Sequence, residues 1–94
     1  MYKTYDENRI TQVPSVTNLA GLKSFLDSLQ NGHYCMSMNG SNTEAVGLPR
    51  SASIMHVDTI TNFSQVELTP YNTPGTTYRL YKVNGTWNST WTEV

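Results

Sequence analysis

The sequence has little charge, a single cysteine and no long apolar run, and each shortage argues against a class of protein. Six Lys and Arg residues nearly balance seven Asp and Glu residues, so the formal net charge is −1. Proteins that bind nucleic acid through its phosphates carry a strong cationic surplus. Only 14% of the residues are charged and 37% are hydrophobic, which fits neither a charged disordered chain nor a membrane span. We therefore expect no nucleic-acid partner and no membrane insertion.

Cys35 is the only cysteine among the 94 residues, which excludes an internal disulfide and a paired-cysteine metal knuckle. Together with His33 and His56 it lacks the ligand spacing of a zinc site. Cys35 and His56 approach each other if their strands pair, but a catalytic cysteine also needs an orienting group and an oxyanion hole. No local motif supplies these groups. We expect no metal, no other cofactor, no catalytic residue and no enzymatic activity.

Most of the polar residues of the chain are neutral and not charged. Asn, Gln, Ser and Thr make up 34 of the 94 residues, and the 13 Thr and six Tyr favour β-strands. The length suits one domain, and a chain this short buries only about 60–65% of the surface that its unfolded form exposes. Without a disulfide, a domain of this size often gains stability from partner subunits. The first ten residues are polar and show no apolar signal region, so we expect synthesis in the cytoplasm.

One segment has helical periodicity. Apolar side chains recur at spacings of three and four, which places on one face the residues Leu19, Leu22, Phe25, Leu26 and Leu29. Thr17 or Asn18 can cap the start, and Gly32 suits the position just past the end. We predict an amphipathic helix over residues 18–31, preceded by an extended segment, 1–17, and followed by the rest of a single domain, 18–94.

After Gly32 the hydrophobic period changes to two, which is typical of strands. We predict strands at 33–38, 52–59, 63–69, 76–83 and 86–94, with loops at 39–44 and 70–75 that form a variable surface. Asn84-Gly85 is the strongest hairpin signal, because both residues tolerate positive φ. The predicted fold class is α+β, with one N-terminal helix followed by a small antiparallel β-sandwich or barrel over residues 33–94.

The part of the chain from about Leu29 to Val94 resembles the pyocin knob domain, a small module of phage tail fibres and R-type pyocin fibres. The resemblance depends most on the predicted closing hairpin, with Tyr78-Arg79, Asn84-Gly85, Trp87 and Trp91. The helix over 18–31 is not part of the motif. This chain departs from the family in the spacing from Trp87 to Trp91 and in the loop before Ala52.

The resemblance implies a virion module of a tailed phage or phage-like particle. It implies a homotrimer in a tail fibre or baseplate that contacts other tail proteins and binds a host-surface glycan or teichoic acid. Two alternatives remain open, namely a structural tail or baseplate subunit without ligand and a monomeric carbohydrate-binding module.

The candidate glycan site consists of aromatic residues and one cation, Tyr71, Arg79, Tyr81, Trp87 and Trp91. Aromatic faces stack on sugar rings and anchor interfaces at low entropic cost. The two tryptophans are equally explained as core residues, because each buries about 150–250 Å². Arg79 either holds an acidic ligand, stacks on a tryptophan or pairs with Glu93.

Overall fold

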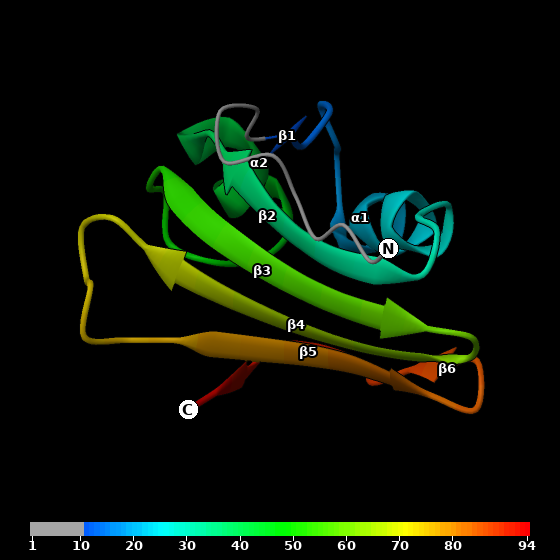
Figure 1. Cartoon of the computed structure of the whole chain (residues 1–94). Coiled ribbons are helices and arrows are strands. Elements are labelled where there is room, and N and C mark those ends of the chain that lie inside the picture. The colour runs from blue at the N-terminus through cyan, green and yellow to red at the C-terminus, as the bar shows by residue number, and fades with distance from the viewer. Residues whose placement is uncertain (1–10) are drawn as a thin grey trace.

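The computed structural model describes residues 11–94, which form one seven-stranded sheet and two helices (Figure 1). The helices are α1 (Leu19–Asp27) and α2 (Gly40–Ala45). The strands are β1 (Thr11–Gln12), β2 (Gly32–Met38), β3 (Ser53–Ile60), β4 (Phe63–Pro70), β5 (Tyr78–Val83), β6 (Thr86–Trp87) and β7 (Thr92–Glu93). No helix in this part of the chain is long and apolar enough to cross a membrane.

The strands follow the order β1-β2-β3-β4-β5-β6, and β7 also pairs with β5. All neighbouring pairs are antiparallel except β1 and β2, which are parallel. Strands β2 to β5 therefore form a simple antiparallel meander, interrupted only by α2 between β2 and β3 (Figure 1). This registration places every second side chain of four strands on the same face.

Helix α1 begins where its cap predicts and ends earlier than the apolar spacing predicts. The side-chain oxygen of Asn18 accepts a 2.8 Å hydrogen bond from the backbone N–H of Gly21, which satisfies one free donor of the first turn. At the other end the N–H of Ser28 bonds Phe25 O and that of Leu29 bonds Leu26 O, a tightened last turn. The predicted span 18–31 is thus too long, although Leu29 still packs against the core.

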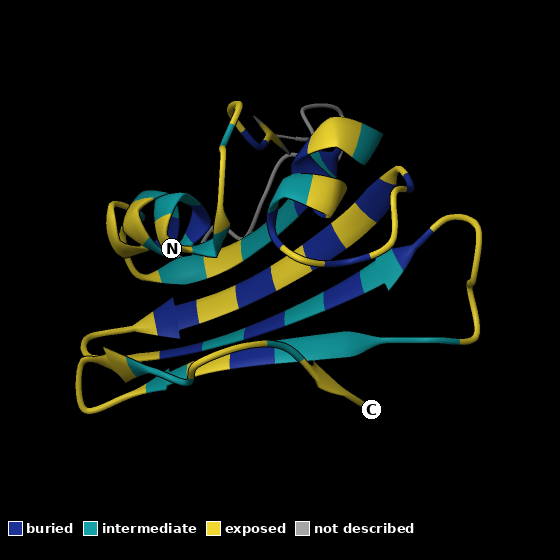
Figure 2. Cartoon of the chain, turned by 180° about the vertical axis from the view of Figure 1, so that it is seen from behind, coloured by how far each residue is buried: buried dark blue, intermediate teal, exposed yellow. Residues whose placement is uncertain are grey.

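The core lies between the helices and one face of the sheet. Strand β3 alternates strictly between buried and exposed residues, as Figure 2 shows, with Met55 and Val57 turned inward. The inward face of the other strands continues this layer, and the buried apolar residues of the sheet are Met36, Met38, Met55, Val57, Val66, Leu68 and Leu80. From α1 they meet Leu22 and Leu26. Each such side chain contributes about 1.5–3 kcal/mol through removal from water.

The structure confirms a helix followed by an antiparallel sheet, but not a sandwich or barrel. Among residues 11–94 there is one sheet, and both helices cover the same face of it (Figure 2). We call the other side the open face, the one that carries Ile54, His56 and Asp58 of β3. A sandwich or barrel would need a second apolar layer. The chain has enough apolar side chains to fill one layer only, and the outward positions of β2 to β5 are largely polar.

Two elements were not predicted. Residues 39–44, expected as a surface loop, mostly form α2, and 11–12 of the expected extended segment pair with β2 as β1. Residues 1–10 of that segment lie outside the described part of the chain. The predicted last strand over 86–94 is divided into the short strands β6 and β7. The Asn84-Gly85 turn is confirmed, with φ of 52° and 81°.

Candidate functional site

The five predicted site residues do not share one surface. Along β5 the odd positions, including Arg79 and Tyr81, lie on the open face, because Leu80 between them is buried under the helices. Trp87 and Trp91 lie on the helix side, packed against the core. Tyr71 stands in the loop after β4 and is 80% exposed. Only Tyr71, Arg79 and Tyr81 are therefore available to a ligand on the open face.

Trp87 and Trp91 attach the C-terminal segment to the helix layer. The indole N–H of Trp87 donates a 3.0 Å hydrogen bond to the carboxylate of Asp27 in α1. The ammonium of Lys82 lies 5.4 Å from the Trp87 ring centroid and 2.9 Å from the same carboxylate. The indole N–H of Trp91 donates to the backbone carbonyl of Val46 at 3.2 Å. Of the two explanations left open by the sequence, these contacts favour the structural one.

Arg79 pairs across the open face with a residue of the neighbouring strand. Its guanidinium donates to Glu67 at 2.8 Å, and the two residues are register partners in β4 and β5. The expected stacking on a tryptophan is wrong, because both tryptophans lie on the opposite side of the sheet. The expected pairing with Glu93 is also wrong, since Glu93 lies opposite Tyr78 in β7. Sequence spacing could not reveal this partner, because the β4–β5 register depends on a seven-residue loop.

Strand pairing places four chemically active side chains in one row of the open face. Cys35 lies opposite His56, His56 opposite Glu67, and Glu67 opposite Arg79. The predicted approach of Cys35 and His56 is thus confirmed, and the thiol is free and half-buried. These four residues line neither the hollow at the β4–β5 loop nor the hollow at the β3–β4 turn. Among residues 11–94 there is also no cluster of three metal-ligating side chains.

Two hollows lie at opposite ends of the open face. The larger, about 680 Å³, lies at the β4–β5 loop between Ile54, Tyr71 and Pro74. We call it the Tyr71 hollow. The smaller, about 330 Å³, lies at the β3–β4 turn beside His33, Ile60 and Phe63. The size of the Tyr71 hollow falls in the range of small-molecule sites, and none of its lining residues is charged.

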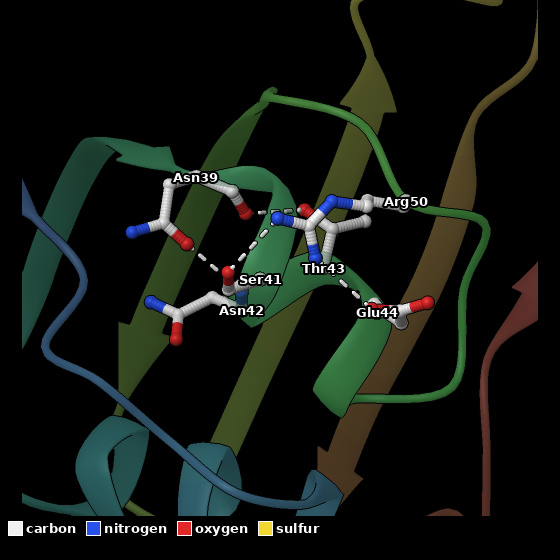
Figure 3. Close-up of polar contacts among 6 residues, drawn as sticks. All are labelled: Asn39, Ser41, Asn42, Thr43, Glu44 and Arg50. Atoms are coloured by element: carbon white, nitrogen blue, oxygen red, sulfur yellow. Dashed lines mark hydrogen bonds and ion pairs between the residues drawn. The ribbon is translucent and has the colours of Figure 1, made fainter.

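A polar cluster around α2 holds the N-terminal part of the described chain. The buried side chain of Asn42 donates to the carbonyls of Val13 and Pro14 and accepts from the N–H of Val16. Asn39 caps the helix by accepting from the N–H of Asn42 at 2.8 Å (Figure 3). Sequence reasoning missed this role. The sequence did contain a signal for the helix: Asn39 precedes Gly-Ser-Asn, and asparagine is favoured at the N-cap of a helix as well as in turns.

The outer side of α2 carries an exposed polar group. Arg50, in the connection to β3, donates to Glu44 at 3.0 Å and to the hydroxyl of Ser41 at 3.3 Å (Figure 3). Both charges of the ion pair are more than half exposed, so the pair contributes little to stability. The charges of Arg50 and Glu44 neutralise each other.

Comparison with known proteins gives no relative from which a role can be transferred. No family model, no curated protein and no solved structure matches the chain.

Proposed function

We propose that the chain is a non-enzymatic module of the tail fibre or baseplate of a tailed phage or phage-like particle, and that it assembles as a homotrimer. The observation that carries the proposal is the open face, which no helix of residues 11–94 covers although it exposes Ile54, Ile60, Phe63, Tyr81 and Val83. Patches of large apolar side chains on an uncovered face mark an interaction surface. In a trimer whose open faces turn inward, these apolar side chains are removed from bulk water.

The resemblance to the pyocin knob domain supports the choice of particle. The residues that carry it form a compact unit, with the Asn84-Gly85 turn followed by Trp87 and Trp91, both anchored under the helix layer. A closing hairpin held by hydrogen bonds to the helix layer suits a module that is exposed outside the cell. The virion is the proposed location, after synthesis in the host cytoplasm, and other tail or baseplate proteins are its further partners.

The first test is assembly and placement. Light scattering coupled to size exclusion should give three times the chain mass of 10.6 kDa at micromolar concentration. An antibody against the chain should label the tails of the particles that contain it in electron microscopy. A chain that stays single at every concentration contradicts the trimer and favours the monomeric carbohydrate-binding module, and label confined to other structures contradicts the tail location.

Glycan adhesion is a second candidate function, favoured by the position of Tyr71. Its ring is 80% exposed at the rim of the larger hollow, where an aromatic face can stack on a sugar and uncharged walls suit a neutral one. Weak single sites suffice when three copies bind together. Binding to immobilised lipopolysaccharide, peptidoglycan and teichoic acid should fall at least tenfold in Tyr71→Ala and stay unchanged in Trp91→Phe, which lies on the helix side. Absence of binding to all three favours the structural subunit without ligand.

A further inference from the structure

The side chains of the open face are segregated by type along the strand direction. The middle positions of β2 to β5 are mostly polar, namely Cys35, His56, Gln65, Glu67 and Arg79, whereas His33 and Asp58 line the smaller hollow together with Ile60 and Phe63. The large apolar side chains, Tyr81 apart, lie at the two ends of the strands. One end holds the Tyr71 hollow with Ile54, and the other holds Ile60, Phe63 and Val83.

The second end is a compact projection, which we call the Phe63 cluster. Ile60 of β3 is the register partner of Phe63 in β4, and Phe63 is the partner of Val83 in β5. The three side chains are 61%, 42% and 47% exposed, so they form one apolar patch rather than scattered residues. At about 3.3 Å per residue, strand β3 places Ile60 of this cluster about 20 Å from Ile54 of the Tyr71 hollow.

The two opposite charges in the middle of the open face, Arg79 and Glu67, are paired with each other within the chain. The pair is partly exposed to water, and stacking two whole faces would remove that water from both copies at a high desolvation cost. A contact confined to the ends leaves the polar middle hydrated. The distribution therefore favours an end-to-end joint over a face-to-face stack.

The amount of apolar surface also indicates a ring. The Phe63 cluster has only three side chains and the Tyr71 hollow is similarly confined, so each end offers far less apolar surface than a whole face would. A stable interface takes about 800 Å² from each partner. One joint is too small to hold two chains, but in a ring every copy makes two joints. A contact between two different patches closes into a ring when its rotation allows.

The geometry points to a heterologous joint between neighbouring copies, in which the Phe63 cluster of one chain is seated in the Tyr71 hollow of the next. The partner in this joint is a second copy of the same chain. The number of copies, three, rests on the proposed homotrimer. Phe63 is a ring small enough for a hollow of about 680 Å³, and the uncharged lining of that hollow matches an apolar occupant. In this assembly the polar middles of three open faces line a hydrated interior.

Two charge variants on the same strand test the joint. Phe63→Glu places a carboxylate in the proposed contact, whereas Gln65→Glu places the same charge two residues further along the same face, in the hydrated middle. We expect native mass to fall from three chains to one in Phe63→Glu and to remain at three in Gln65→Glu, with unchanged circular dichroism in both. A trimeric Phe63→Glu protein overturns the joint but leaves the proposed trimer intact. A monomeric wild-type chain overturns both.

Cross-linking tests the same joint without relying on a loss of assembly. In a Cys35→Ser background, Pro74→Cys places a thiol at the Tyr71 hollow and Ile60→Cys places one in the Phe63 cluster. A short bismaleimide should link a mixture of the two single variants into dimers and should leave each variant alone unlinked. Self-linking of either variant alone indicates a symmetric contact and overturns the proposal.

A glycan in the Tyr71 hollow is the competing occupant, and the same variants separate it. If the joint fills the hollow, the trimer binds no envelope glycan there, and Tyr71→Ala weakens the trimer by at least tenfold in dissociation constant. If Tyr71→Ala abolishes binding to lipopolysaccharide or teichoic acid and leaves the trimer mass unchanged, the hollow holds a sugar and the joint is wrong.

Discussion

The ammonium group of Lys23 donates a 2.7 Å hydrogen bond to the backbone carbonyl of Asn88, 65 residues further along the chain. It also reaches the carbonyl of Ser89 at 3.3 Å. Through this contact helix α1 holds the segment between β6 and β7, where Asn88 also exchanges two hydrogen bonds with the backbone of Tyr81 in β5. The C-terminal segment is therefore held in two ways, by side-chain contacts with the helix layer and by strand pairing with β5.

Replacing Lys23 with Met should lower the free energy of unfolding by about 1 kcal/mol, because the methylene stem is kept and the charge-assisted hydrogen bonds are lost. Urea unfolding measures the change. Ser24→Ala, an exposed position on the same helix, is the control and should stay within about 0.5 kcal/mol of the wild type. Equal stability of Lys23→Met and wild type would show that the contact does not hold the segment.

Asn42→Ala should lower the free energy of unfolding by about 2–3 kcal/mol, more than the other polar substitutions proposed. The buried amide satisfies two backbone carbonyls and one N–H of residues 13–16, and its removal leaves these groups without a partner. The exposed neighbour Ser41→Ala serves as the control, with a loss below about 0.5 kcal/mol. Thermal unfolding of both variants gives the comparison, and similar melting temperatures would contradict the account.

Gly85→Ala should lower the free energy of unfolding by about 1 kcal/mol, because residue 85 has a φ of +81° in the hairpin turn and a Cβ atom disfavours that conformation. Gly75→Ala is the matched control, since a Cβ there meets no atom within 4 Å and no positive φ is required. If chemical denaturation gives the two variants the same stability, the turn does not have the conformation described.

Trp91→Phe should lower the free energy of unfolding by about 1 kcal/mol through loss of the hydrogen bond to Val46. Because the indole lies on the helix side, the variant should keep the native mass of the wild type. Urea unfolding measures the change in stability, and light scattering on the same sample measures the native mass. Wild-type stability combined with a changed assembly would place Trp91 in an interface instead of the core.

The sequence predicted most of the strands because their periodicity is strong. Alternation over 52–59 and 63–69 located β3 and β4 to within a residue at each end, and Asn84-Gly85 located the turn after β5. Helix α2 was missed because Asn, Gly and Ser are as common in turns as at the start of a helix. Its stability comes from the long-range bonds of Asn42, which no local pattern contains.

The candidate site was predicted less well, because it too depends on contacts between residues far apart in the sequence. The even separation of Trp87 and Trp91 indicated a shared side, which is correct, but not which side of the sheet faces the helices. That choice depends on Asp27 and Val46, more than 40 residues away in each case. The pairing of Arg79 with Glu67 was likewise not predicted, because strand register is a property of the assembled sheet.

Native mass over a dilution series tests the central claim most directly. The account predicts a cooperative change between one and three chains of 10.6 kDa, with no stable dimer, because a single joint is too small to hold two copies. A chain that remains single from low micromolar to millimolar concentration would contradict it, as would a dimer that is stable across the same range.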